Sequence, residues 1–499
     1  MARTARTIEV RISVPDGPAP LRHRLGDALV EQIRTGRLRP GDALPASRAL
    51  AKQLSVSRTA VVDAYDQLLA AGFVTATRGS GTFVASGADR AALAGAVPQV
   101  ADPARPRVRR RPARGPEPVG PRWSLRPSSP DTSLLDQGDW RRAWRSAARL
   151  PLGAVFPTPG AHHELQAALS DHLRRTRGIV AAPEEILLVP GIAAALRPLA
   201  HAAGLVGRTV AVEDPGYCDL HGALAAVGSR VRPVPVDADG LDPGLLQRGD
   251  CAVYVTPAHQ FPLGGRMPVE RRCDLLAWAR RTGGLLLEDD YDGEYRYDVS
   301  PLPAMRSMVD ARDHVVYLGT TSKILSPALR VAWVVAPARL APALARELVA
   351  HGLAVDAVAA SAVAELIRTG ALSRHLARAS RHYATRREAL TTAISRHLPG
   401  LATVGVDAGL HVVLLLPDGT DDTAVAGRAL REGVQVEPLS GYAIQDARSG
   451  LVLGYARLPP TQADEVVRIL ARAVRAQRAE ATRSTTAEAT SAGLVSGSQ

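Results

Sequence analysis

The sequence is short of cysteine and of long apolar runs, and both shortages exclude whole classes of protein. Only three of its 499 residues are cysteines, Cys218, Cys251 and Cys273, and they form no C-x-x-C pair. This argues against a disulfide scaffold or a cysteine-based zinc site and favours a reducing cytoplasm. No run of about 18 consecutive apolar residues suggests a membrane span, and the first residues lack the apolar core of a secretory signal.

Lysine is also rare. Of the 61 Lys and Arg residues only two are lysines, Lys52 and Lys323. An arginine guanidinium stays protonated in proteins, whereas a desolvated lysine amine can lose its proton and attack a carbonyl. A lysine that persists in so arginine-rich a chain is therefore a candidate for chemistry that arginine cannot perform.

The positive charge is concentrated near the N-terminus. The net charge is +12, and residues 1–130 hold 21 of the 61 basic residues but only 10 of the 49 acidic residues. A basic surface attracts polyanions and binds phosphate backbones without regard to sequence. The alternative is a solubilising tail, unless a recognition element lies beside the charge.

The first 85 residues contain such an element. Apolar residues spaced four apart from Leu21 to Ile33 indicate an amphipathic helix. Two more helices are expected over residues 47–54 and 57–72, each opened by a serine N-cap. Residues 73–85, FVTATRGSGTFVA, indicate two strands joined by a glycine turn. Three helices followed by a hairpin are the order of a winged helix-turn-helix.

In this motif the helix over residues 57–72 would enter the major groove with its first residues at base edges. An arginine there, Arg58, can donate two hydrogen bonds to guanine, while the preceding helix and the hairpin turn would contact backbone phosphates. The DNA-binding candidates are Ser57, Arg58 and Thr59 on this recognition helix, Ser47, Arg48 and Lys52 on the preceding helix, and Arg78, Gly79 and Gly81 in the hairpin turn. The alternative is a winged helix used only for protein contacts.

The chain divides into four parts. The winged helix occupies residues 15–86. Residues 87–131 are rich in proline and arginine and predict a flexible linker. Residues 132–478 alternate strand-like apolar runs, such as TVAVEDPG and GLLLEDD, with helical stretches, which indicates a large α/β domain. The Ala-, Ser- and Thr-rich residues 479–499 predict a disordered tail.

The clearest chemical signal is Y-L-G-T-T-S-K-I-L-S-P-A-L-R, residues 317–330. A cofactor that combines an aldehyde with a phosphate needs an amine for an imine, and hydroxyls and a cation for the phosphate. Lys323 can supply the amine, while Thr320, Ser322 and Arg330 can hold the phosphate. The alternative is an ordinary surface lysine beside a turn.

An acidic group follows an apolar strand upstream of this motif. The stretch GLLLEDDYDGEYRY places Asp289 and Tyr291 at the carboxyl end of a strand, where α/β proteins usually bind ligands. A carboxylate beside a pyridine nitrogen keeps that nitrogen protonated, and a phenol can bond a ring hydroxyl. Taken alone, the stretch would suit a solvated acidic loop.

These motifs carry two resemblances. The stretch PGDALPASRALAKQLSVSRTAVVDAYDQLLAAGFVTATRGSGTFV resembles the GntR-type winged helix. The acidic strand end together with Lys323 resembles the fold-type I pyridoxal-phosphate proteins of the aspartate aminotransferase family. VTPAHQFPLGGRMPVERR and EDDYDGEYRY resemble the MocR/GabR regulators, which fuse a GntR winged helix to that fold. The resemblance spans roughly residues 20–475 and implies a mainly parallel sheet and pyridoxal 5'-phosphate as cofactor.

The resemblance also implies roles for individual residues. Lys323 would carry the imine, Asp289 would face the pyridine nitrogen and Tyr291 would bond the ring hydroxyl. The further cofactor-binding candidates are Thr320, Ser322, Arg330, Tyr217, His259, Gln260, Gly191, Ile192 and Ala193. No metal site is predicted, because His162-His163-Glu164 lacks the spacing of a zinc motif and indicates a helix surface.

The chain departs from the family at two places. The first phosphate loop normally reads S-G-x-Q-x-A-L, but residues 190–196 are PGIAAAL, so only backbone N–H groups at a helix start can contribute there. Aminotransferases also place a carboxylate-binding arginine in a late strand, where this chain has Val452; Arg457 is close in sequence but is expected to point elsewhere. Without that arginine an amino-acid substrate loses a bidentate anchor.

The sequence therefore predicts a transcriptional regulator that binds double-stranded DNA and pyridoxal phosphate. The resemblance implies a head-to-tail homodimer, while the cysteine usage and the lack of long apolar runs favour a cytoplasmic protein with no membrane attachment. The missing arginine favours pyridoxal phosphate itself as the effector, as in PdxR-like regulators of vitamin B6 synthesis, and an amine or amino acid is the second form of this hypothesis. The rival is a catalytically active class I/II aminotransferase, and residual transamination is compatible with the first hypothesis.

Overall fold

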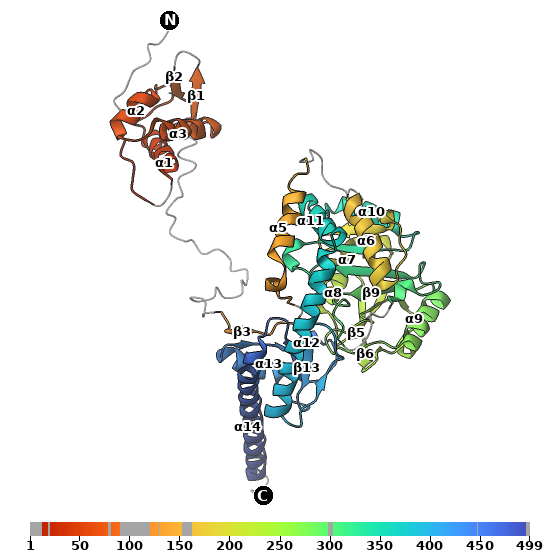
Figure 1. Cartoon of the computed structure of the whole chain (residues 1–499). Coiled ribbons are helices and arrows are strands. Elements are labelled where there is room, and N and C mark those ends of the chain that lie inside the picture. The colour runs from red at the N-terminus through yellow and green to blue at the C-terminus, as the bar shows by residue number, and fades with distance from the viewer. Residues whose placement is uncertain are drawn as a thin grey trace. The chain divides into compact units, whose positions relative to one another are not determined.

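The computed structural model describes residues 12–17, 20–77, 81–89, 120–127, 129–151, 162–297, 303–446 and 448–495. The chain folds as two compact units, Met1–Arg114 and Gly115–Gln499, and both are drawn in Figure 1. Each unit has its own hydrophobic core.

The first unit is a winged helix-turn-helix, as predicted. Its elements are α1 (Leu21–Arg34), α2 (Ser47–Leu54), α3 (Arg58–Ala70), β1 (Val74–Thr77) and β2 (Gly81–Val84). The strands pair antiparallel, and Ala43 bridges Phe83 beside them. Leu25, Leu29 and Ile33 of α1 are buried against α3 and the hairpin, so the apolar spacing of the sequence does define the core face.

The two serines expected to cap helices behave differently. Ser57 caps α3, because its hydroxyl oxygen accepts a hydrogen bond from the N–H of Ala60 at 3.2 Å. Ser47 does not cap α2: it is the first helical residue, and Ala46 occupies the N-cap position without a side-chain hydrogen bond. Of the predicted hairpin turn, Arg78 and Gly79 lie outside the described residues.

The second unit is built on an eight-stranded, mainly parallel sheet. Its strands are β4 (Ile186–Val189), β5 (Thr209–Asp214), β6 (Arg230–Asp237), β7 (Gly240–Leu241), β8 (Asp250–Val255), β9 (Leu285–Asp290), β10 (Val315–Thr320) and β11 (Ala332–Val335). They lie in the order β4-β11-β10-β9-β8-β5-β6-β7. Only β11 and the short edge strand β7 run antiparallel to their neighbours.

Helices cover both faces of this sheet (Figure 1). One face packs against α7 (Ile192–Ala202), α8 (Cys218–Ala226) and α10 (Ala341–Ala350). The other face packs against α9 (Val269–Thr282) and α6 (His163–Arg177). The helices α11 (Ala357–Arg368) and α5 (Gln137–Ala147) stack beyond α6. In β9, Leu285 and Leu287 face the first set and Leu286 the second, because successive side chains of a strand point to opposite faces. Burial on both faces explains why these strands are continuous apolar runs.

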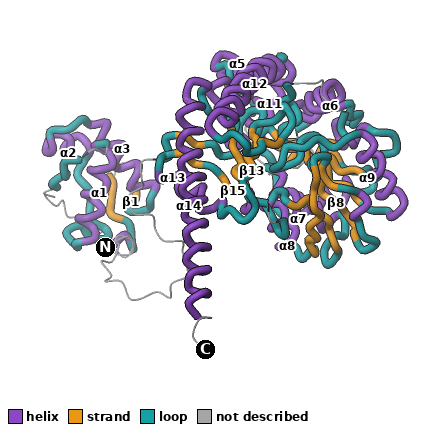
Figure 2. Tube along the Cα trace, turned by 90° about the horizontal axis from the view of Figure 1, so that it is seen from below, coloured by secondary structure: helices purple, strands orange, loops and turns teal. Residues whose placement is uncertain are grey.

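A smaller subdomain follows α11. Its helices are α12 (Ala371–His397), α13 (Asp422–Arg431) and α14 (Ala463–Val495). Its antiparallel sheet has the strand order β12 (Thr403–Val404), β13 (His411–Leu415), β16 (Gly450–Gly454) and β15 (Glu437–Pro438). In addition, β3 (Trp123–Ser124) pairs parallel with β14 (Val434–Gln435). Figure 2 shows α14 as a single long helix. In the described part of the chain no helix is both long and apolar enough to cross a membrane.

Two boundaries differ from the sequence prediction. The predicted linker, residues 87–131, ends early: β3 already belongs to the second unit, because Trp123 and Leu125 are apolar side chains with a core to enter, and both are buried there. The predicted disordered tail is helical up to Val495, and its five alanines favour helix. Residues 90–119, most of the predicted linker, lie outside the described residues.

We predict that Leu125→Ala destabilises the second unit by about 2–5 kcal/mol, because it leaves a cavity at a position only 1% exposed. Thermal unfolding followed by circular dichroism checks this, with Leu430→Ala as the control because Leu430 is 49% exposed. Equal unfolding midpoints for the two variants would show that the β3 segment is not part of the folded unit.

Candidate functional site

A cavity of about 500 Å³ lies at the carboxyl edge of the large sheet. Ten of the residues predicted to bind a cofactor line it: Gly191, Ile192, Ala193, Tyr217, Asp289, Tyr291, Thr320, Ser322, Lys323 and Arg330. They converge because β4, β5, β9 and β10 run in the same direction, so the loops that leave their carboxyl ends meet at one edge. Residues more than 130 positions apart in the sequence, such as Gly191 and Arg330, are thereby brought into contact.

Lys323 is held in the cavity wall just after β10. Burial lowers the pKa of its amine below the ordinary value, and the carboxylates of Asp292, Asp289 and Asp219 oppose that shift. A desolvated amine with a lowered pKa is a better nucleophile towards an aldehyde, since more of it is unprotonated at neutral pH. The other lysine, Lys52, lies exposed on α2 of the first unit.

Asp289 is the buried carboxylate of the cavity. Tyr254 donates its hydroxyl proton to one oxygen, Oδ2, while the other, Oδ1, is buried and has no hydrogen-bond partner among the described residues. Burial raises the pKa of Asp289 to about 7. A buried oxygen without a donor is costly, so this site suits a ligand that brings an N–H group, and a protonated pyridine nitrogen fits that requirement.

Another group of residues in the cavity wall suits an anion. Arg330 makes no hydrogen bond or ion pair within the described part of the chain, and Thr320 lies nearby, donating its hydroxyl to that of Ser322 at 2.9 Å. The helix α7 begins at Ile192, and its N-terminus offers backbone N–H groups. Gly191 has a φ of +146°, and a Cβ there would lie 3.1 Å from a guanidinium nitrogen of Arg330, so only glycine leaves this space open.

His259 and Gln260 correct the sequence prediction, because they lie behind the cavity wall. Both are almost fully buried, and neither lines the cavity. The Gln260 amide donates to the carbonyl of Pro215 at 3.0 Å and accepts from the N–H of Leu263 at 3.0 Å. These backbone partners turn Gln260 inward, and Phe261 faces the cavity in its place.

The structure also adds lining residues that the sequence analysis did not select. Arg126 and Glu437 form an ion pair at 3.1 Å at the cavity wall. Thr256, Asp219 and Tyr442 line the wall as well. Arg126 was placed in the linker, and Glu437 and Tyr442 come from the smaller subdomain, so only the tertiary fold brings them here. Thr256 and Asp219 had a local signal, since each closely follows a strand end that carried other candidates.

The amino-acid anchor expected of an aminotransferase is absent from its usual strand. Val452 lies in β16 and is fully buried in the hydrophobic core, away from the cavity. Arg457 is exposed and does not line the cavity. The cavity therefore lacks a guanidinium from this strand to bind a substrate carboxylate.

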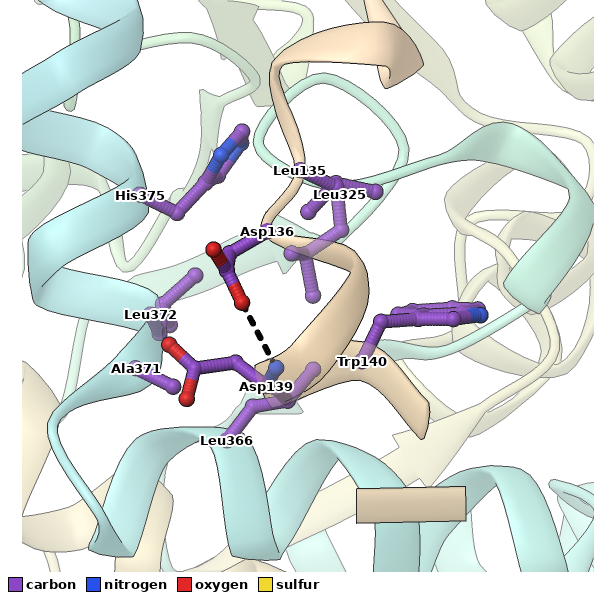
Figure 3. A pocket seen from close by; sticks show the side chains of 9 residues that line it. All are labelled: Leu135, Asp136, Asp139, Trp140, Leu325, Leu366, Ala371, Leu372 and His375. Carbon is purple, nitrogen blue, oxygen red and sulfur yellow. Dashed lines mark hydrogen bonds between the residues drawn. The ribbon is translucent and has the colours of Figure 1, made fainter. Parts of the chain in front are cut away.

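A second hollow lies between α5, α11 and α12 and is too small to compete. Figure 3 shows its lining, with the N–H of Asp139 donating to Asp136 and with His375 at the rim. Its volume is about 10 Å³, which is room for about one water molecule. Of these two hollows, the larger one alone has room for a cofactor.

The described DNA-binding candidates lie on the surface of the first unit. Ser57, Arg58 and Thr59 are exposed at the N-terminus of α3, and Arg48 and Lys52 are exposed on α2. Ser47 is half-buried, and Gly81 opens β2 with a φ of +110°. Within the described residues Arg48, Lys52 and Arg58 form no ion pair, so their charges are available to phosphates and bases.

Comparisons with known proteins match both units. The family model for aminotransferase class I and II matches residues 133–470, and the model for bacterial regulatory proteins of the gntR family matches residues 21–84. The pyridoxine biosynthesis transcriptional regulator PdxR of Corynebacterium glutamicum is 35% identical over 88% of this chain and 93% of its own length. The regulator TauR of Rhodobacter capsulatus is 34% identical over 94% of this chain and 99% of its own length. The probable rhizopine catabolism regulatory protein MocR of Rhizobium meliloti is 32% identical over 89% of this chain and 92% of its own length.

Solved structures match the second unit. An archaeal alanine:glyoxylate aminotransferase superposes with a TM-score of 0.67 at 24% identity, over 71% of this chain and 90% of that one. The α-aminoadipate aminotransferase LysN of Thermus thermophilus superposes with a TM-score of 0.65 at 27% identity, over 71% of this chain and 92% of that one. A winged helix joined to an aminotransferase-type fold defines a class of bacterial transcriptional regulators. This chain belongs to the MocR/PdxR-type regulators of the GntR family.

We predict that Asp289→Asn stabilises the protein without ligand at pH 8 but not at pH 4. The folded-state pKa of Asp289 is raised from 3.8 to about 7, so its contribution to stability is lost as the pH rises through that range. The variant should unfold at least about 2 °C higher at pH 8, as measured by differential scanning calorimetry. An equal effect at both pH values would show that the carboxylate is not strained by burial.

We also predict that Arg58→Ala weakens binding to the operator about 10-fold or more, because an arginine–guanine contact contributes about 1–3 kcal/mol of discrimination. Binding to unrelated DNA should change much less. Fluorescence anisotropy with both duplexes measures this, and Arg34→Ala is the control, because Arg34 lies on α1 in an ion pair with Glu31. Equal loss on both duplexes would assign Arg58 to phosphate contact.

Proposed function

We propose that the second unit binds pyridoxal 5'-phosphate covalently through Lys323, and that occupancy of its cavity changes the affinity of the winged helix for an operator. One observation carries this proposal: a half-buried amine with a lowered pKa, a buried carboxylate oxygen and a guanidinium share one cavity, and the last two have no partner among the described residues. These are the three groups that an aldehyde, a pyridine nitrogen and a phosphate require. The aminotransferase family to which the unit belongs uses this cofactor.

Different residues would bind different parts of the ligand. Lys323 would bond the aldehyde, and Asp289 would accept a hydrogen bond from the ring nitrogen. Arg330 and the α7 N-terminus would hold the phosphate, with Tyr217 against the ring. When bound, the cofactor supplies an electrophilic carbon that reacts with amines and an electron-poor ring. The protein contributes orientation and charge.

The favoured effector is pyridoxal phosphate itself, and the favoured targets are genes of vitamin B6 metabolism. Val452 gives no anchor for an amino-acid carboxylate, and the similar regulator PdxR is named for pyridoxine biosynthesis. An amine or amino acid acting on the bound cofactor is the second form of this proposal. We further infer a head-to-tail homodimer acting on DNA in the cytoplasm.

The rival is an active aminotransferase whose winged helix is incidental. The same buried Val452 and the exposed Arg457 disfavour it, because a transaminase must hold the substrate carboxylate to orient the reacting amine. Multiple-turnover transamination with an ordinary amino acid and keto acid would favour the rival, and slow residual turnover would not.

We predict that pyridoxal phosphate changes operator affinity of the wild-type protein at least about 10-fold and leaves that of Lys323→Ala unchanged. Anisotropy titrations of an operator duplex with and without the cofactor measure this. Lys52→Ala, the other lysine, is the matched control: as a DNA-binding candidate it should bind the operator more weakly, but the cofactor should change its affinity by the same factor as in the wild type. A response that requires an added amine would contradict vitamin sensing and support the second form.

A further inference from the structure

Behind the cavity wall lies a buried group of three polar residues: Asp292, His259 and Tyr291. Asp292 and Tyr291 follow β9, and His259 follows the neighbouring strand β8. Asp292 is 1% exposed, His259 2% and Tyr291 9%. Only Tyr291 reaches the cavity, so the other two can affect a ligand only through it.

The contacts within this group fix the proton on one nitrogen of the imidazole. Nδ1 of His259 lies 3.1 and 3.0 Å from the two carboxylate oxygens of Asp292 and 2.9 Å from the hydroxyl oxygen of Tyr291. A carboxylate can only accept, so Nδ1 carries the proton and donates it. The imidazole is therefore a donor on the side that faces Tyr291, and the two rings stack at 5.9 Å with an angle of 26°.

This arrangement determines what the Tyr291 hydroxyl can do. Because Nδ1 carries its proton, it has no lone pair to accept the phenol proton, so the hydroxyl does not donate to the histidine. Burial, together with Asp292, Asp289 and Glu213, raises the pKa of Tyr291 well above its ordinary value, so the phenol keeps its proton. That proton is left free to be donated into the cavity.

The smaller subdomain closes over the group from the other side. A Cβ at Gly409, whose φ is +71°, would lie 2.5 Å from Nδ1 of His259 and 2.6 Å from an oxygen of Asp292, so no other residue leaves room for this contact. His411 of β13 packs on the His259 ring at 5.2 Å and bonds the carbonyl of Pro262 at 2.9 Å. The imidazole has little room to turn.

We propose that Asp292 and His259 are positioning residues that make Tyr291 a hydrogen-bond donor to the aromatic hydroxyl of the bound cofactor. The inference rests on the proposed function, because it requires pyridoxal phosphate in the cavity. Donation to the ring oxygen favours its negative charge, so the donor lowers the apparent pKa of the lysine-bound chromophore. Asp292 and His259 act on that pKa only through the phenol.

A metal ion is the competing explanation, because His259, Asp292 and His411 offer ligand atoms within 4.8 Å of one another. The contacts of His259 Nδ1 with Asp292 and with Tyr291 have hydrogen-bond lengths, which accounts for them without an ion. Equilibrium dialysis of the apoprotein against zinc tests this directly. Stoichiometric binding that is lost in His411→Gln would overturn the proposal.

The main test is a spectroscopic pH titration of the reconstituted full-length protein. Tyr291→Phe should raise the apparent pKa of the chromophore by about one unit, the effect of losing one hydrogen bond to a charged group. Asp292→Asn and His259→Gln should shift it in the same direction. Each should have no further effect in the Tyr291→Phe background, because both act through that hydroxyl.

His259→Asn is the conservative variant, since its amide nitrogen can replace Nδ1 as a donor whereas that of Gln reaches the position of Nε2. It should titrate like the wild type. Additive shifts in the double variants, or equal shifts for Asn and Gln, would show a merely structural role and overturn the inference. If the wild type forms no visible chromophore with pyridoxal phosphate, the proposed function itself fails and the inference with it.

Discussion

The second unit keeps ionisable groups without complete partners at the carboxyl edge of a parallel sheet, and the rest of the site depends on this constraint. Asp289 has a buried oxygen with no donor among the described residues, and burial lowers the pKa of Lys323. Such groups cost stability in the empty protein. A ligand that brings a ring N–H and an aldehyde would relieve both costs at once, so in the proposed function the same unpaired groups would provide the affinity for the cofactor.

The same edge is where the smaller subdomain attaches, which gives the cavity a physical connection to the rest of its unit. Asp214, at the end of β5, accepts hydrogen bonds from the backbone N–H groups of Ile444, Gln445 and Asp446. The N–H of Gly216 donates to the carbonyl of Tyr442, whose side chain lines the cavity. A ligand that moves this wall therefore acts on both subdomains, which a sensing domain requires.

The sequence located the parts of the site that lie at strand ends. Asp289, Thr320 and Lys323 each follow an apolar strand, and parallel strands bring such positions together. It could not locate Tyr442, which reaches the cavity only through the packing of the smaller subdomain. It also placed His259 beside the ring, because a motif fixes order along the chain but not which side chain faces inward. The sequence analysis wrongly placed Trp123 in the linker for a similar reason. Two apolar residues that follow a Pro/Arg-rich stretch carry no sequence signal that they enter a core.

The most direct test of the account is to find where the cofactor bonds. The protein is incubated with pyridoxal phosphate, reduced with borohydride to fix any imine, digested and analysed by mass spectrometry. The account predicts a phosphopyridoxyl adduct on the peptide that contains Lys323, at a stoichiometry near one per chain. An adduct confined to Lys52 or the N-terminal amine, with Lys323 unmodified, would contradict it.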